Sequence, residues 1–307
     1  MLSDLRGFSV VTEGYSPQEV VDMLNRYFDH MCKIIYRYGG TVDKFMGDSI
    51  MALFGASVSR PSHIEHAVSC AVEMQIAMDT FNKENENLGM PNLYMGIGIN
   101  TGEVVAGKIG SDLHSEYTVI GNEVNLASRI EAYSLRGQIL ISEKTFSRIK
   151  DLIVVENPIS ASVKGRREPT PLYELLSIGE PYNLQVPERE ARRSLRVEVN
   201  IPFEFQILEG KVVRSEICEG RVLDLSSGGM FASTLTEVEP YFNIVFRFAF
   251  NILGVKTSDI YGKILRVKKV ADLYEMNIEF TAINPGDRNA IKELVSQMVH
   301  SGFIPKA

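Results

Sequence analysis

The chain has no tryptophan, and among its 307 residues only three are cysteine and five are histidine. Neither residue type shows the spacing of metal ligands, and an odd number of distant cysteines gives no disulfide framework. Such cysteine usage suits a reducing compartment, the cytoplasm. We interpret the thiols as core or surface side chains; they are Cys32, Cys70 and Cys218.

A long hydrophobic run is also missing. No stretch of about 18 apolar residues exists, and Asp4 and Arg6 lie where a signal peptide would have its apolar region. The chain contains no G-x-x-x-x-G-K-[ST] loop, and Gly96-x-Gly98 does not continue to G-x-G-x-x-G, which excludes P-loop and Rossmann sites. We therefore expect a cytoplasmic chain without membrane insertion.

Positive charge is in deficit, with 32 Lys and Arg against 39 Asp and Glu and a formal net charge of -7. This balance argues against nucleic acid and anionic membranes as partners, and favours small molecules or proteins. Hydrophobic residues at 45% and charged residues at 23% are typical of a folded globular chain. At about 150 residues per domain, the length predicts two domains.

Two long helices are predicted in the first half. Ser16 and Glu19 form a capping box before apolar residues that recur at three- and four-residue steps, and a Gly-Gly pair ends this helix. Ser62 and Glu65 form a second capping box, which predicts a helix that lasts to about Phe81.

Strand patterns alternate with these helices. The stretch TVDKFMGDSIMALFG reads as a hairpin with Asp48 in its turn, and LYMGIGIN and EVVAGKIG read as two further strands. EYTVIG is a strand that turns at Gly121 into a helix from about Asn122, and the strand QILIS and the short helix EKTFSRI follow. The interleaved order predicts an α+β domain of the ferredoxin-like kind over residues 1–176.

The second half has a different pattern. Residues 177–190 are polar with two prolines, which is typical of a linker. In residues 191–307, short β-patterned runs follow one another at roughly 8 to 12 residue spacing, which predicts a small all-β barrel or sandwich. One helix closes this domain; it begins at Asn284-Pro285 and runs to about His300.

Four motifs in the first half stand in a specific order: SDLRGFS, VDKFMGDSIMALFG, YTVIGNEVNLASRIE and VKGR. Together they closely resemble the catalytic domain of class III nucleotidyl cyclases, across residues 1–176. The resemblance implies a phosphorus–oxygen lyase that acts as a head-to-tail homodimer. In that family the metal acids of one protomer face the base-reading lysine and the Asn/Arg helix of the other. Family members normally have a full strand before the first metal acid, but only Met1, Leu2 and Ser3 precede Asp4, which indicates a truncated first strand.

The resemblance makes Asp4 and Asp48 the metal acids. In forming a 3′,5′-cyclic nucleotide, the ribose 3′-hydroxyl attacks the α-phosphorus and pyrophosphate leaves. Two oxygen-seeking divalent cations, Mg²⁺ or Mn²⁺, suit this displacement, one activating the hydroxyl and one holding the leaving phosphates. Taken alone, Asp48 would be read as a turn former and Asp4 as a terminal residue.

The resemblance also makes Lys44 the base-reading lysine and Thr118 its partner. A lysine donates to adenine N1, and a threonine hydroxyl can accept from the 6-amino group. Guanine has a protonated N1 and a carbonyl at position 6, and guanylyl members usually carry an acidic residue in place of the lysine. ATP is therefore favoured over GTP. Taken alone, Lys44 would be a solvated charge and Thr118 an ordinary strand residue.

Asn125 and Arg129 are four residues apart on a predicted helix and share one face. In the family the asparagine orients the ribose and the arginine neutralises charge that develops around the phosphates. Lys164 resembles the lysine that binds the triphosphate. The alternatives are a polar pair at a helix N-terminus with an exposed arginine, and a solvated basic loop.

Two signatures in the second half look like those of PilZ domains, over roughly residues 187–300. They are an R-x-x-x-R stretch and a D-x-S-x-x-G stretch, whose residues are Arg192, Arg196, Asp224, Ser226 and Gly229. PilZ domains bind cyclic di-GMP, a bacterial second messenger. Arginine forks can read guanine or grip phosphate, a carboxylate can accept from guanine N1–H, and glycine allows close approach. Arg193 is an extra basic residue with no firm role, and each stretch alone would be a solvated linker end or a hairpin turn.

The combined hypothesis is an adenylate cyclase fused to a cyclic di-GMP receptor domain, so that one messenger tunes synthesis of another. Two alternatives stay open. One is a guanylate cyclase of the same fold. The other is an inactive cyclic di-GMP adaptor, in which the first domain serves only for dimerisation.

Overall fold

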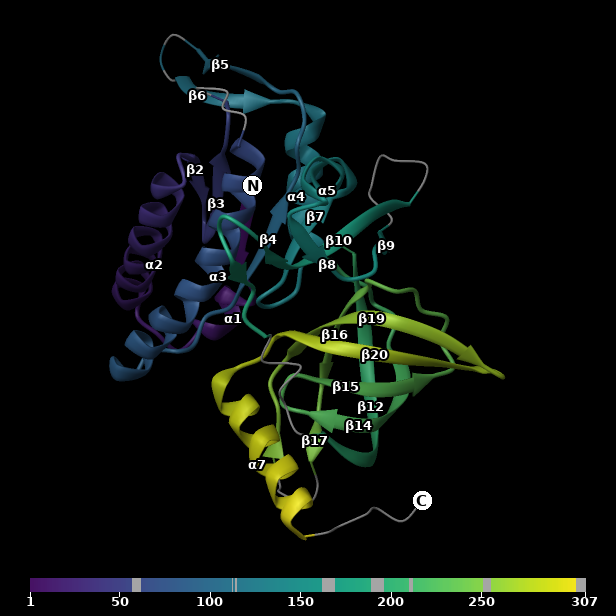
Figure 1. Ribbon diagram of the computed structural model, residues 1–307. Helices are drawn as coiled ribbons and strands as arrows, with labels where there is room; N and C mark the ends of the chain where they lie inside the picture. The colour runs from purple at the N-terminus through teal and green to yellow at the C-terminus, as the bar shows by residue number, and fades with distance from the viewer. Residues whose placement is uncertain are drawn as a thin grey trace. The chain divides into compact units, whose positions relative to one another are not determined.

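The computed structural model describes residues 1–56, 62–111, 113, 115–161, 169–188, 196–209, 212–250 and 255–301. The chain divides into two compact units by its contacts. The first comprises Met1–Arg6 and Tyr15–Pro187, and the second comprises Gly7–Gly14 and Glu188–Ala307. The first combines helices with a sheet, and the second is a β-barrel with a C-terminal helix (Figure 1). In the described part of the chain, no helix is long and apolar enough to cross a membrane.

The first unit is built on a sheet with the strand order β11-β10-β7-β4-β1-β3-β2. Its strands are β1 (Leu2–Leu5), β2 (Thr41–Met46), β3 (Ser49–Leu53), β4 (Met95–Ile99), β7 (Ile139–Ser142), β10 (Thr170–Ile178) and β11 (Leu184–Gln185). β8 (Ile153–Val155) and β9 (Ile159–Ala161) pair with β10 off this path. β5 (Val105–Gly110) and β6 (Ser115–Ile120) form a separate antiparallel ribbon. The expected α+β class is confirmed.

The short strand β1 lies inside the sheet. It pairs with β3 on one side and β4 on the other, both antiparallel. Leu2 and Leu5 are buried, which fixes the strand in the core. Asp4 pairs with Gly96 of β4 and is carried near the β2–β3 turn, because Ser3 pairs with Ile50 of β3.

The helix α2 (Pro17–Arg37) confirms its predicted capping box. The Ser16 hydroxyl accepts from the Glu19 backbone N–H, and the Glu19 carboxylate accepts from the Ser16 N–H. The apolar face of α2 buries Tyr27 and Met31, and the Tyr27 hydroxyl donates to the Met95 sulfur of β4. α2 therefore covers the sheet that carries the site.

The helix α3 (His63–Asn87) corrects two expectations. Ser62 makes no side-chain capping bond, so the second capping box is wrong. Its backbone (φ -92°, ψ 14°) is not extended, and its hydroxyl lies 3.4 Å from His66 Nε2 instead. The helix also continues past Phe81, because Asn85 near its end is buried and donates to the carbonyl of Pro91.

Two further helices match their predicted positions. α4 (Asn122–Tyr133) follows the turn at Gly121, and α5 (Glu143–Ile149) is capped by the Ser142 hydroxyl. α1 (Phe8–Val11) is a short helix that was not predicted. Part of the predicted linker is strand, because β10 continues to Ile178 and pairs there with β11. A polar composition does not prevent an edge strand whose outward side chains face water.

The second unit closes into a barrel rather than a sandwich. Its strands are β12 (Arg196–Glu209), β14 (Cys218–Ser226), β15 (Gly229–Thr234), β20 (Leu273–Ala282), β19 (Ile260–Val270) and β16 (Asn243–Arg247), and the β12–β16 pairing closes the ring. The short strands β13 (Val212–Val213), β17 (Ala249–Phe250) and β18 (Val255–Lys256) accompany it. Phe205, Phe246 and Phe280 fill the core. Helix α7 (Pro285–Ser301) begins as predicted, with the Asn284 side chain accepting from Gly286 N–H.

Candidate active site

The carboxylate of Asp4 is held by two neighbours. Arg6 Nη1 donates to Asp4 Oδ2 at 2.9 Å, and the Ser49 hydroxyl donates to Asp4 Oδ1. The Arg6 side chain is only 12% exposed and also donates to Glu131 and, at 2.7 Å, to the Ser134 hydroxyl. Arg6 thus holds the Asp4 carboxylate in position by a charge-assisted hydrogen bond.

Asp48 lies beside Asp4, in the β2–β3 turn. Burial, and after it the negative charge of Asp4, raise the pKa of Asp48 to about 6. Backbone hydrogen bonds from Asp48 and Leu5 and the charge of Arg6 act the other way. Two carboxylates that repel each other in a partly buried site are the arrangement that a bound cation relieves.

The donor set fits a hard divalent cation. Both acids offer only oxygen atoms, which Mg²⁺ and Mn²⁺ prefer. Within the described residues no three His, Cys, Asp or Glu side chains group into a metal cage. A site of two carboxylates suits ions whose remaining ligands are water, backbone oxygen and substrate phosphate.

Lys44 and Thr118 form a second group, where β2 faces β6. Lys44 Nζ donates to Glu116 at 2.9 Å, and this hydrogen bond raises the pKa of Lys44 above its ordinary value. The Thr118 hydroxyl donates to Asp43 Oδ2 at 2.8 Å. The structure therefore brings together the two residues that were predicted to read the base.

The predicted pair on α4 shares a face, as four-residue spacing requires. Asn125 is exposed and Arg129 is half-buried, whereas their chain neighbours Leu126 and Ile130 are buried. Lys164 lies outside the described residues.

On the barrel, Arg196 and Asp224 lie on the neighbouring strands β12 and β14. Arg196 Nη1 donates to Asp224 Oδ1 at 3.0 Å, and the arginine side chain is 49% exposed. An exposed arginine and its acid partner offer both a fork and a carboxylate to a ligand. Arg192 and Arg193 lie outside the described residues.

Ser226 and Gly229 shape the β14–β15 turn. The buried Ser226 hydroxyl donates to the Gly229 carbonyl at 3.0 Å and accepts from the Gly229 N–H at 3.1 Å. A Cβ on Gly229 would lie 2.4 Å from the Ile278 carbonyl oxygen. In the structure these two motif residues therefore act on the turn; a role in ligand binding stays a prediction.

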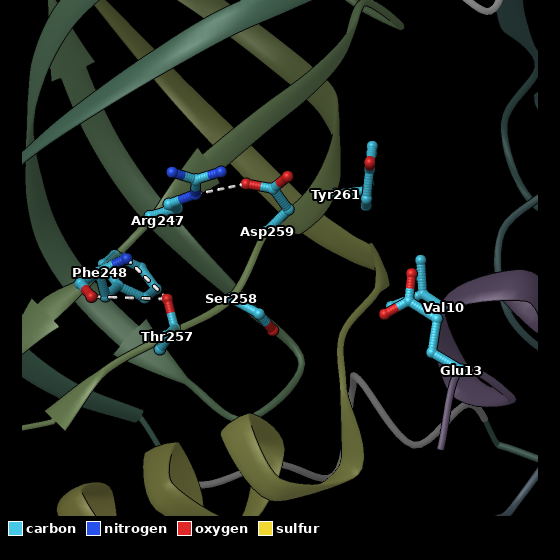
Figure 2. A pocket seen from close by; sticks show the side chains of 8 residues that line it. All are labelled: Val10, Glu13, Arg247, Phe248, Thr257, Ser258, Asp259 and Tyr261. Atoms are coloured by element: carbon cyan, nitrogen blue, oxygen red, sulfur yellow. Dashed lines mark hydrogen bonds and ion pairs between the residues drawn. The ribbon is translucent and has the colours of Figure 1, made fainter. Parts of the chain in front are cut away.

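A cavity on the barrel holds none of the predicted site residues. Figure 2 shows Arg247 of β16 donating to Asp259 there, while the Phe248 N–H donates to the Thr257 hydroxyl at 2.8 Å. These residues stand outside both PilZ signatures, and no sequence motif pointed to them.

Sequence reasoning missed the partners of the predicted residues. Arg6 stands within the SDLRGFS motif, so its proximity to Asp4 could have marked it. Asp43 also stands within a motif, beside Lys44, but its contact with Thr118 carried no signal, because β2 and β6 are distant in sequence. The contact of Glu116 with Lys44 was hidden for the same reason.

Both domains match models of known families. Residues 1–176 match the model of the adenylate and guanylate cyclase catalytic domain. The chain belongs to this cyclase family. Residues 189–297 match the model of the PilZ domain, so the expected fusion of a cyclase domain with a PilZ domain is confirmed.

Two curated relatives are adenylate cyclases. Adenylate cyclase 1 of Rhizobium meliloti (strain 1021) is 33% identical over 180 residues, which cover 58% of this chain and 27% of the relative. The adenylate cyclase of Anabaena cylindrica is 36% identical over 186 residues, which cover 57% of this chain and 36% of the relative. The chain thus spans about a third or less of the length of these relatives.

The solved structures that resemble the cyclase domain include both base specificities. The guanylyl cyclase Cya2 is 46% identical with a TM-score of 0.59, covering 61% of this chain and 94% of that one. The adenylyl cyclase CyaB from P. aeruginosa is 38% identical with a TM-score of 0.57, covering 58% of this chain and 93% of that one. Because one of these structures is a guanylyl cyclase and the other an adenylyl cyclase, the structural likeness does not distinguish between the two bases.

Proposed function

We propose that this chain is an adenylate cyclase that converts ATP into 3′,5′-cyclic AMP and pyrophosphate, with a PilZ domain that binds cyclic di-GMP and regulates it. The observation that carries the catalytic proposal is the acid pair: Asp4, held by Arg6, lies beside Asp48, whose pKa is raised to about 6 by burial and by the charge of Asp4. Such a pair has the chemistry to hold divalent cations against a triphosphate.

Each predicted site residue of the cyclase domain has a role in this reaction. Two divalent cations, held by Asp4 and Asp48, would activate the 3′-hydroxyl and neutralise the triphosphate. Asn125 orients the ribose, so that its 3′-oxygen forms a bond to the α-phosphorus as the bond to the pyrophosphate oxygen breaks. Arg129 and Lys164 stabilise the negative charge of the phosphates.

Base choice follows from Lys44 and Thr118. The lysine donates to adenine N1, and the threonine accepts from the 6-amino group. The likeness to the guanylyl cyclase Cya2, at 46% identity, favours GTP as the second candidate substrate. Presenting ATP and GTP separately with Mg²⁺ or Mn²⁺, and identifying the cyclic product by chromatography, decides between them.

We further propose a head-to-tail homodimer with two equivalent sites. In this arrangement the acids of one protomer face the base-reading residues and α4 of the other. The β5–β6 ribbon supports it, because the ribbon carries exposed apolar side chains that a second copy would cover; they include Val105, Ile109, Tyr117 and Ile120.

The PilZ domain would take cyclic di-GMP at the Arg196–Asp224 pair, together with Arg192. Ser226 and Gly229 give the adjoining turn its shape. Binding changes turnover only if the ligand prefers one of two arrangements of the enzyme. The test is the rate of cyclic AMP formation at saturating cyclic di-GMP; an unchanged rate would contradict regulation. An adaptor without activity would bind cyclic di-GMP and form no cyclic nucleotide.

A further inference from the structure

The strand β2 contains an irregularity at the base-reading site. In a regular strand, neighbouring side chains point to opposite faces. Here the pairing with β3 shifts, with Val42 opposite Ala52 and Lys44 opposite Met51, so Asp43 is an extra residue. A bulge of this kind re-aims side chains. As a result, two consecutive residues, Asp43 and Lys44, both reach β6.

Side chains of β2 and β6 contact each other in two hydrogen-bonded pairs. Thr118 and Glu116 stand two apart on β6 and share a face. Lys44 Nζ donates to Glu116, and the Thr118 hydroxyl donates to Asp43 at 2.8 Å. The Asp43 side chain is only 2% exposed, and Lys44 Nζ lies 3.8 Å from its carboxylate. The Asp43 carboxylate is thus enclosed by the two residues assigned to the base.

The direction of the Thr118 hydrogen bond matters for base recognition. A hydroxyl has one hydrogen to donate and two lone pairs to accept with, whereas a carboxylate only accepts. Once its hydrogen points to Asp43, Thr118 can offer a purine only an acceptor. Adenine presents a 6-amino donor to it, but guanine presents a carbonyl oxygen, and two acceptors repel.

We propose that Asp43 is a positioning residue that sets the purine specificity of the site, by holding Thr118 as an acceptor. The proposal rests on the nucleotidyl cyclase function proposed above. Lys44 alone does not enforce the choice, because an ammonium can donate to guanine O6 as well as to adenine N1. The carboxylate behind Thr118 supplies the discrimination that Lys44 lacks.

The variant Asp43→Asn tests whether the direction of the Thr118 hydrogen bond sets base choice. The amide can turn its NH₂ toward Thr118, which frees the hydroxyl hydrogen for guanine O6. We expect the ratio of kcat/KM for ATP to that for GTP to fall about tenfold, as for one hydrogen bond exchanged, with GTP used better in absolute terms. Loss of packing alone would weaken both nucleotides and would not improve GTP.

Thr118 supplies the matched controls. Thr118→Ser keeps a hydroxyl that can donate to Asp43 and should keep the preference for ATP. Thr118→Val removes the hydroxyl and should lower the preference for ATP about tenfold. In the Thr118→Val background, Asp43→Asn should change the ratio no further. If Asp43→Asn does not fold, the two Thr118 variants still test the acceptor role of Thr118 on which the proposal depends, and an unchanged ratio in Thr118→Val would overturn the proposal.

Measurements of nucleotide binding distinguish a failure of this proposal from a failure of the proposed catalytic function. The 3′-deoxy forms of ATP and GTP lack the attacking hydroxyl, so their affinities with Mg²⁺ report base choice without turnover. If the wild-type chain forms no cyclic nucleotide but prefers 3′-deoxy-ATP, and Asp43→Asn relaxes that preference, the catalytic function fails and the role of Asp43 stands. Normal turnover with an unaltered ratio in folded Asp43→Asn overturns the role of Asp43. Binding of neither nucleotide overturns both.

Discussion

At the scale of single residues, Asp48 carries an unfavourable charge in the absence of a cation. Burial and the charge of Asp4 raise its pKa from 3.8 to about 6. A carboxyl with a raised pKa binds its proton more tightly in the folded state than in the unfolded state. Its ionised form therefore destabilises the fold, and this effect is complete only above about pH 6.

We predict that Asp48→Asn raises the melting temperature of the metal-free protein, and that the gain over wild type grows as the pH rises from 3.8 to about 6 and is constant above that. The matched variant Asp4→Asn should lower it, because Asp4 accepts from Arg6 and Ser49. Thermal unfolding across this pH range measures both. In either variant, added Mg²⁺ or Mn²⁺ should raise the melting temperature less than in wild type. Destabilisation by Asp48→Asn would contradict the described acid pair.

Sequence reasoning also selected the residues of the candidate site. Motifs located Asp4, Asp48, Lys44 and Thr118, because their order along the chain is specific. The partners that set their behaviour were not visible. Asp43 precedes Lys44, and a regular strand would send it to the opposite face; only the bulge brings it to Thr118.

At the scale of elements, the pattern of residues predicted most helices and strands. Two Ser-x-x-Glu sequences were predicted to form capping boxes, and only the first one does. Ser16 enters its helix from extended backbone (φ -66°, ψ 154°), which aims the hydroxyl at the helix, whereas Ser62 does not. Sequence gives the capping residues but not the angle at which the chain enters. Closure of the barrel was also undecided, because it depends on the pairing of β12 with β16, which are distant in sequence.

Arg196 at the start of β12 and Asp224 near the end of β14 form the ion pair proposed to bind cyclic di-GMP. Arg196→Ala should weaken cyclic di-GMP binding by at least about tenfold, since an arginine fork to guanine or phosphate is removed. Stability should change little, because an exposed ion pair contributes about 0 to 1 kcal/mol. Titration calorimetry measures the affinity. The control is Arg247→Ala, which breaks an exposed pair with Asp259 on the same barrel and should leave the affinity unaltered.

Gly229→Ala, unlike Arg196→Ala, should lower the stability of the barrel. The added Cβ would lie 2.4 Å from the Ile278 carbonyl oxygen, so β15 must move away from β20. We expect destabilisation by about 1 to 3 kcal/mol, as for other overpacked sites. Urea unfolding of Gly229→Ala beside Arg196→Ala measures the difference; equal stability of Gly229→Ala and wild type would show that the turn accommodates a side chain.

At the scale of the whole molecule, the proposed dimer gives a test by complementation. Asp48→Asn and Arg129→Ala should each abolish turnover alone, because each damages both equivalent sites. In a mixed dimer one site carries both substitutions and the other carries neither. Random mixing makes about half the dimers mixed, so about a quarter of wild-type activity should return. Recovery of no activity from a mixture that exchanges subunits would contradict sites shared between protomers.

We propose metal-dependent cyclisation of ATP at the acid pair of Asp4 and Asp48. The most direct measurement is the initial rate of cyclic AMP formation by the wild-type chain and by Asp48→Asn, at saturating ATP with Mg²⁺ or Mn²⁺. We predict cyclic AMP and pyrophosphate in equal amounts from wild type, and a rate lower by about a hundredfold or more from Asp48→Asn. Equal rates from the two proteins, or no cyclic AMP from wild type, would contradict it.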